Sequence, residues 1–134
     1  MLFEVASNYI DTPFVHQGRV PGSGLDCVGV YVCAAHAVGL KLHDFIAYGK
    51  EASSKELLAR LKENFVLVEP KEKQKDDLLL FWVITKNIPQ HIGLYGGNGS
   101  FIHAYSRPQY GKVRLDSLEG RWEKHLHSVW RLAV

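Results

Sequence analysis

A cysteine at the junction between a glycine-rich loop and an apolar helix constrains this chain more than any other feature. Residues 11–25 are rich in glycine and proline and predict a loop. Asp26 follows at an N-cap or first-turn position, and a helix is expected from about Cys27 to Val38, ending near Gly39. Because this helix is apolar nearly all round, it should be buried. The free backbone N–H groups of its first turn would favour the thiolate form of Cys27.

Two histidines twelve residues apart, His91 and His103, flank a glycine-rich turn at residues 96–99. The sequences on either side, 90–95 and 100–104, predict a β-hairpin. Side chains alternate between the two faces of a strand. An odd number of turn residues therefore places the histidines directly opposite each other on one face, and an even number places them on opposite faces. The glycines permit a three-residue turn with a bulge, and directly opposite Cβ atoms lie about 5 Å apart.

A hydrogen-bonded pair of imidazoles beside a cysteine is suited to nucleophilic catalysis. His91 would be the base that faces Cys27, and its presence would also favour the thiolate. His103 would orient His91 and favour its correct tautomer. Each residue also has a purely structural interpretation, with Cys27 as a small residue at a helix start and each histidine bonded to a backbone carbonyl. The combination of all three is more specific than any one of them.

Helices are expected in the first part of the chain and strands in the second. The helices are expected at 2–10, about 27–38 and about 54–63, the last after the capping-box pattern Ser53–Glu56. The strands are predicted at 65–68, 78–84, 90–95, 100–104, 112–116 and 128–132. The charged stretch 71–77 is expected to be a solvated turn. Short connections between the strands indicate an α+β fold with a largely antiparallel sheet. The length of 134 residues favours a single domain over residues 1–134.

The two cysteines, Cys27 and Cys33, are expected to be free thiols. On one helix their Cα atoms would lie about 9 Å apart, whereas a disulfide needs less than about 7 Å. Free thiols suit a reducing compartment, and Cys33 is expected to be an inert core residue. The first residues lack the basic and apolar regions of a signal peptide, and no apolar run approaches the about 20 residues of a membrane span. We therefore expect synthesis and retention in the cytoplasm, unless other machinery exports the protein.

Neither the net charge nor the histidine spacing indicates a nucleic-acid, membrane or metal partner. The formal net charge of +2 favours neither a nucleic acid nor a membrane. The histidines at positions 36, 43, 125 and 127 lack the spacing of metal ligands, and neither a cysteine pair nor an HExxH motif accompanies them. We therefore expect no metal and no cofactor.

Four segments resemble the NlpC/P60 cysteine peptidases in order and spacing, and the resemblance covers nearly the whole chain. They are Gly24-Leu25-Asp26-Cys27-Val28-Gly29, Asp77-Leu78-Leu79-Leu80-Phe81, His91-Ile92-Gly93-Leu94-Tyr95 and Phe101-Ile102-His103-Ala104. The resemblance implies a papain-like fold, in which the nucleophile helix packs on an antiparallel sheet, and a catalytic triad of Cys27, His91 and His103. It also implies hydrolysis of peptidoglycan stem peptides, commonly between γ-D-glutamate and a diamino acid.

The loop before the nucleophile carries further expected contacts. The segment Thr12–Arg19 looks like the subset of the family found in phage and prophage tails, so the protein could reach the cell wall within a tail and contact tail proteins. His16 and Arg19 could line the cleft, where arginine can hold a substrate carboxylate, or decorate a surface loop. Asp26 matches an acidic position of the family, and it could contact a substrate amine or cap the helix.

Three positions depart from the pattern of the family. Many members have tyrosine where this chain has Phe14 and serine where it has Val28, so two polar groups beside the cleft are absent and substrate recognition could differ. The usual Pro-Gly-Asp turn is Lys75-Asp76-Asp77 here, a change expected to be structural. Two alternatives stay open: an amidase, deamidase or acyltransferase on the same fold, and a non-catalytic tail assembly module.

Overall fold

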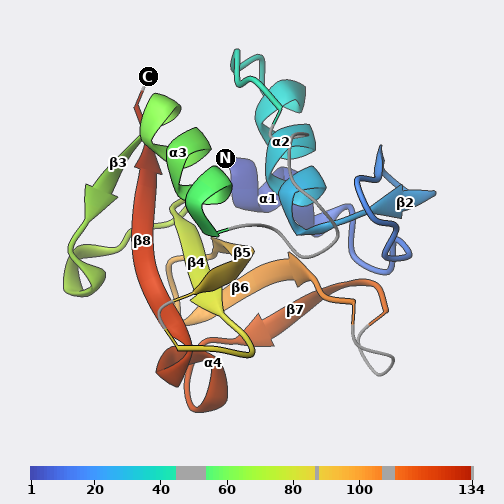
Figure 1. The fold of residues 1–134 in the computed structure, drawn as a ribbon. Coiled ribbons are helices and arrows are strands. Elements are labelled where there is room, and N and C mark those ends of the chain that lie inside the picture. Colours follow the sequence, from blue (N-terminus) through green and yellow to red (C-terminus); the bar gives the residue numbers. More distant parts are fainter. Residues whose placement is uncertain (45–53, 87, 107–110, 134) are drawn as a thin grey trace.

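A six-stranded antiparallel sheet forms the centre of the structure, a computed structural model that describes residues 1–44, 54–86, 88–106 and 111–133 (Figure 1). Across the sheet the strands follow the order β3-β8-β4-β5-β6-β7. Their bounds are β3 (Phe65–Val68), β4 (Leu78–Trp82), β5 (Pro89–Tyr95), β6 (Ser100–Ala104), β7 (Val113–Ser117) and β8 (Leu126–Leu132). Together with the helices, this sheet confirms the predicted α+β architecture.

Helices cover both faces of the sheet. The helices are α1 (Leu2–Ser7), α2 (Cys27–Ala37), α3 (Ser54–Asn64), the 3₁₀ helix η1 (Pro70–Glu72) and α4 (Arg121–Lys124). The first three pack on one face and share a core with it, whereas α4 contributes Trp122 to a second core on the other face (Figure 1). The nucleophile helix predicted from the sequence therefore lies on the sheet, as expected.

The central strand β4 is buried on both sides. Leu78 and Leu80 join the core beneath α1, α2 and α3, whereas Leu79 and Phe81 join the core on the α4 side. All four side chains are fully buried. This two-sided burial explains why the strand is an unbroken apolar run instead of an alternating pattern.

The expected buried helix is α2, and its two ends follow the sequence signals. Asp26 is the N-cap, and its carboxylate accepts a hydrogen bond from the Gly29 N–H at 2.7 Å. The helix stops before Gly39, whose φ of +85° is a left-handed conformation that favours glycine. The helix boundaries expected from residues 26–39 are therefore confirmed.

Two N-terminal segments differ from the predictions. The first helix ends at Ser7 instead of residue 10. The expected loop at 11–25 contains a small antiparallel sheet of β1 (Arg19–Val20) and β2 (Gly24–Leu25), with Gly22 at φ +86° in the turn between them. Strands of two residues carry no periodic signal, so the glycines and prolines dominated the prediction.

The C-terminal half differs at one strand and one helix. The strand predicted at 78–84 ends at Trp82, because its pairing with both neighbouring strands shifts register at Phe81. The four-residue helix α4 was not expected, since it is too short for a periodic pattern. The other strands and α3 lie within two residues of their predicted bounds. The capping box begins at Ser53, which lies outside the described residues.

Two further residues are placed differently from the predictions. Within the charged stretch 71–77, Asp77 is only 1% exposed and pairs with Arg131 at 2.8 Å, so this turn is not wholly solvated. Cys33 is partly exposed instead of fully buried, and its thiol donates to the Arg19 carbonyl oxygen at 3.3 Å. Both cysteines are free thiols, as predicted.

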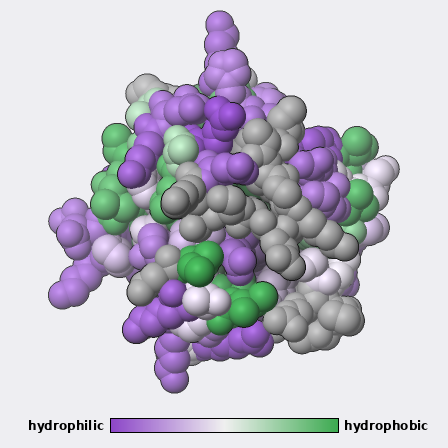
Figure 2. All heavy atoms as spheres, in the orientation of Figure 1, coloured by the Kyte–Doolittle hydropathy of each residue, from purple (hydrophilic) through white to green (hydrophobic). Residues whose placement is uncertain are grey.

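Most of the coloured residues in Figure 2 are hydrophilic, and the apolar ones form small separate groups. Val66 and Leu67 of the edge strand β3 are among the exposed large apolar residues. Within the described segments, none of the helices combines the length and apolar character needed to cross a membrane.

Candidate active site

Asp26 anchors the start of the nucleophile helix. Its Oδ1 accepts hydrogen bonds from the Gly29 N–H at 2.7 Å and from Arg19 Nη1 at 2.8 Å, and its Oδ2 accepts one from the Gln17 N–H at 2.9 Å. The residue is 2% exposed. A buried carboxylate surrounded by three donors of its own chain is suited to capping the helix and holding the preceding loop. The structure therefore favours the capping alternative over contact with a substrate amine.

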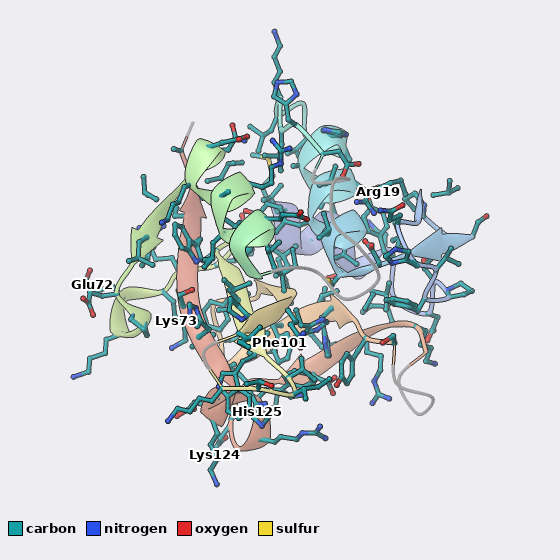
Figure 3. All side chains as sticks on the ribbon, in the orientation of Figure 1. Arg19, Glu72, Lys73, Phe101, Lys124 and His125 are labelled. Carbon is teal, nitrogen blue, oxygen red and sulfur yellow. The ribbon has the colours of Figure 1, made fainter. Side chains whose placement is uncertain are left out.

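Arg19 ties the same loop to the segment after α2. Its Nε and Nη2 donate to the two carboxylate oxygens of Asp44 at 2.7 and 2.8 Å, and its Nη1 donates to the Gly18 carbonyl oxygen at 2.9 Å as well as to Asp26. Figure 3 shows Arg19 beside α2. The bidentate pair with Asp44 occupies the edge of the guanidinium that a substrate carboxylate would need.

Gly29 lets the loop cross the helix closely. A Cβ at this position would lie 2.3 Å from the Gly18 carbonyl oxygen and 3.2 Å from Arg19 Nη1. Because the first of these contacts is with backbone, a larger residue could be accommodated only by moving the loop away from α2. The close packing of loop on helix fixes the position of Cys27, two residues earlier.

Cys27 lies at the first position of α2, with its side chain against the backbone of β5. The N–H groups of Ile92 and Val28 approach the sulfur and lower the pKa of the thiol, but burial of the sulfur and the negative charge of Asp26 raise it more strongly, to about 12. The sequence predicted a thiolate, and the structure instead favours a neutral thiol at neutral pH. The physical reason is desolvation, which a sequence pattern does not contain.

We expect the rate of Cys27 alkylation to rise continuously with pH. With a pKa of about 12, the thiolate fraction increases about tenfold per pH unit from pH 7 to 10, whereas an ordinary cysteine with a pKa near 8.5 reaches a plateau. The measurement is the iodoacetamide rate by mass spectrometry in a Cys33→Ala variant, beside a short cysteine peptide as control. A plateau below pH 8 would instead indicate a thiolate–imidazolium pair.

The two strand histidines are hydrogen-bonded to each other. His91 Nε2 lies 2.7 Å from His103 Nδ1, and the two residues are 4% and 1% exposed. The expected pair on one face of the hairpin is therefore present. This contact joins β5 to β6. Ile92, the residue after His91 on β5, directs its N–H toward the sulfur of Cys27.

The pairing register differs from direct opposition. Leu94 pairs with Ile102 and Tyr95 with Phe101, so each histidine is displaced by two residues from the position opposite the other. The turn has three residues, as the prediction allowed, but it is centred on Asn98 because Gly96 donates to the Ser100 carbonyl at 2.8 Å. Diagonal neighbours on one face remain within reach of long and aromatic side chains. The expectation of a directly opposite pair is therefore wrong, and the expectation of a shared face is right.

Aromatic rings enclose the histidine pair. Trp122 of α4 lies 4.9 Å from the ring of His103 and 5.6 Å from that of His91, and Tyr105 lies 5.1 Å from the ring of His91 (centroid distances). Phe81 of β4 packs against His91 at 6.0 Å. Burial lowers the pKa of both histidines, that of His91 to well below its usual value, and the proximity of His103 lowers the pKa of His91 further. Burial therefore favours the neutral form of both imidazoles.

One polar partner of this pair, Asp116 on β7, was not expected from the sequence. Its Oδ2 lies 2.6 Å from His103 Nε2, and its Oδ1 lies 3.9 Å from Arg114 Nη2. The strand was predicted at 112–116, but its register against β6 was not, because the connection at 105–111 does not fix which residues pair. Alternation along the strand was the one available signal, and it does not select a partner.

The remaining predicted site residues lie on the loop before α2 and in the first turn of that helix. Phe14 is partly buried and packs against the helix-side core, and His16 is exposed. The Val28 side chain is 2% exposed and belongs to the core, so only its backbone N–H is offered to the site. In the described part of the chain, no group of three or more potential ligand side chains could hold a metal ion.

Comparisons with known proteins identify the family of this chain. A sequence model of the NlpC/P60 family matches residues 11–131. The chain is 28% identical over 127 residues to the probable endopeptidase YafL of Escherichia coli strain K12, a match that covers 90% of this chain and 44% of that protein.

Solved structures show the same fold. A Staphylococcus aureus protein of the NLP/P60 family, described as similar to lipoprotein, matches with a TM-score of 0.72 and 20% identity, over 99% of this chain and 40% of that one. The NlpC/p60 domain of the peptidoglycan hydrolase SagA matches with a TM-score of 0.69 and 22% identity, over 99% of this chain and 96% of that one. The chain thus spans less than half the length of the Escherichia coli and Staphylococcus aureus proteins, and the likeness confirms the fold expected from the resemblance.

Proposed function

Because the chain belongs to the NlpC/P60 family, we propose that it is a cysteine endopeptidase that hydrolyses the stem peptides of peptidoglycan. One arrangement carries the proposal: α2 places the sulfur of Cys27 beside the Ile92 N–H, and the preceding residue, His91, is hydrogen-bonded to His103. The similar proteins support the class of reaction, since one is named a probable endopeptidase and another a peptidoglycan hydrolase.

The proposed reaction begins with a neutral thiol and neutral imidazoles. His91 takes the thiol proton as the sulfur of Cys27 attacks the carbonyl carbon of the scissile amide. The backbone N–H groups of Cys27 and Val28, in the first turn of α2, donate to the oxygen of the tetrahedral intermediate. His91 then gives the proton to the leaving nitrogen as the C–N bond breaks, which leaves a thioester. Water, deprotonated by His91, hydrolyses the thioester and restores the thiol.

The finer parts of the proposal come from the resemblance. We place the scissile bond between γ-D-glutamate and a diamino acid, and we propose Phe14 and His16, on the loop before the nucleophile, as substrate contacts. Arg19 would act on the site through Asp26, to which it is paired. We also propose assembly into a phage tail, on the basis of the segment Thr12–Arg19, after synthesis in the cytoplasm. Residues 1–134 would act as one catalytic domain.

The test is mass spectrometry of purified muropeptides after incubation with the wild-type protein and with Cys27→Ala. We expect new fragments with the wild type alone, and their masses identify the bond that is cut. A product that keeps the whole peptide but exchanges an amide for a carboxylate would identify a deamidase instead. Absence of any product with several wall chemotypes would contradict the proposed hydrolase and favour the non-catalytic alternative.

A further inference from the structure

Three polar side chains form a continuous hydrogen-bonded row across β5, β6 and β7. His91 Nε2 lies 2.7 Å from His103 Nδ1, and His103 Nε2 lies 2.6 Å from Asp116 Oδ2. The pairing of His103 with Arg114 on β7 places Asp116 two residues away on the same face, so the row runs diagonally across the three strands. Both ring nitrogens of His103 are engaged in this row.

The chemistry of the terminal group sets the direction of every hydrogen bond in the row. A carboxylate accepts hydrogen bonds and donates none, so His103 must carry its hydrogen on Nε2 to bond Asp116. A neutral imidazole has one N–H, which leaves Nδ1 of His103 as an acceptor. His91 must therefore donate from its Nε2, and its own Nδ1 carries no hydrogen.

We propose that Asp116 is a positioning residue that sets the tautomers of both histidines. It thereby keeps Nδ1 of His91 unprotonated, so that this nitrogen can accept the proton of the Cys27 thiol. The proposal rests on the proposed function for the role of that nitrogen, but the tautomers themselves are a property of the resting protein. Nδ1 is the ring nitrogen nearer the backbone, and the sulfur of Cys27 lies beside the N–H of the next residue, Ile92.

In the described part of the chain, Asp116 is the carboxylate hydrogen-bonded to this row. Four aromatic side chains pack against the histidine rings: Phe81, Phe101, Tyr105 and Trp122. Arg114 is the charged neighbour on β7, at 3.9 Å from Asp116, and it lowers the pKa of His103. Asp116 opposes both Arg114 and burial by raising that pKa through its hydrogen bond and its charge. The same charge would stabilise the imidazolium that forms when His91 takes the thiol proton.

Asp116→Asn keeps the shape of the side chain but removes its charge and allows the histidine tautomers to change. An amide can turn its NH₂ toward His103 Nε2, which reverses every hydrogen bond in the row and places a hydrogen on His91 Nδ1. We expect kcat/KM on muropeptides to fall about 10²–10⁴-fold, by analogy with the loss seen when the aspartate of a serine protease triad becomes asparagine. Glu119→Gln is the matched control. Glu119 is exposed and lies just after the same strand, and its substitution also removes one negative charge.

The decisive readout is the tautomer itself, from long-range ¹H–¹⁵N correlation spectra of the histidine rings at neutral pH. In the wild type and in Glu119→Gln we expect His91 and His103 to be protonated at Nε2 and unprotonated at Nδ1. In Asp116→Asn we expect the Nδ1–H forms to appear. Asp116→Ser, which removes the carboxylate with less bulk, serves as a second variant should the asparagine variant fail to fold.

Two results would overturn the proposal. One is a wild-type spectrum with the hydrogen of His91 on Nδ1. The other is an Asp116 variant whose tautomers are unchanged and whose kcat/KM stays within about threefold of the wild type. Since the spectra need no substrate, a wild type that cleaves no muropeptide would contradict the proposed function while the tautomer result still decides the role of Asp116.

Discussion

Replacing His91 by glutamine should reduce kcat/KM on muropeptides by a factor on the order of 10⁴–10⁶. Glutamine can keep a hydrogen bond to His103, but it cannot take the proton of the Cys27 thiol. The structure makes that proton transfer necessary, because the pKa of the thiol is raised to about 12 and almost no thiolate exists at neutral pH. The measurement is the initial rate of product formation by mass spectrometry at low substrate concentration.

His127→Gln provides the matched control for this variant. His127 is exposed on β8, and its Nδ1 bonds the Ser128 hydroxyl at 2.9 Å, away from the histidine pair. We expect its kcat/KM to equal that of the wild type. If His91→Gln, folded by circular dichroism, kept more than about a tenth of the wild-type rate, His91 would not be the base.

Replacing Asp26 by alanine should lower the free energy of unfolding by about 3–5 kcal/mol, the usual cost of removing one partner of a buried ion pair. The substitution removes the acceptor for the Gly29 and Gln17 N–H groups and one of the carboxylates bonded to Arg19. About 1 kcal/mol of the loss is the N-cap alone. Urea unfolding followed by tryptophan fluorescence measures the change.

The Asp26 variant has a second, opposite effect at the nucleophile. Because the charge of Asp26 raises the pKa of the Cys27 thiol, its removal should lower that pKa and speed alkylation at pH 8 in molecules that remain folded. Asp26→Asn separates the effect on the thiol pKa from the effect on stability, since the asparagine amide oxygen can still accept the hydrogen bond of the Gly29 N–H. It should show the same change in alkylation with a smaller loss of stability. A loss below about 1 kcal/mol for Asp26→Ala would show that the buried network does not hold the helix start.

The parts of the site that depend on short stretches of sequence were predictable. The start of α2 follows from Asp26 and the glycines around it, and the hairpin follows from the glycine-rich turn between two apolar strands. An odd number of turn residues, which the glycines at 96–99 permit, predicted His91 and His103 on one face of the hairpin. The turn centre was not predictable, because several positions within 96–99 can adopt the required backbone, and strand pairing selects among them.

Contacts between segments far apart in the sequence could not be predicted from local patterns. Arg19 was expected either to line the cleft or to decorate a surface loop. Its bonds to Asp26 and Asp44 depend on how the chain returns after α2. Asp116 lies thirteen residues after His103, beyond a connection whose length does not set the register of β7. Each of these side chains gains its partner only when the strands and the loop are packed.

The sequence alone therefore determined the order of the longer helices and strands, including the helix that carries Cys27 and the strands that carry the two histidines. These depend on periodicity, capping and turn residues read over short windows. Only the tertiary structure decided the protonation state of Cys27, the diagonal offset of the histidines and the contact between His103 and Asp116. The pKa of a thiol depends on how far water is removed from it and on which charges lie near it, and a strand register depends on the packing of a whole face. Both are properties of segments far apart in the chain, so they arise only when those segments meet.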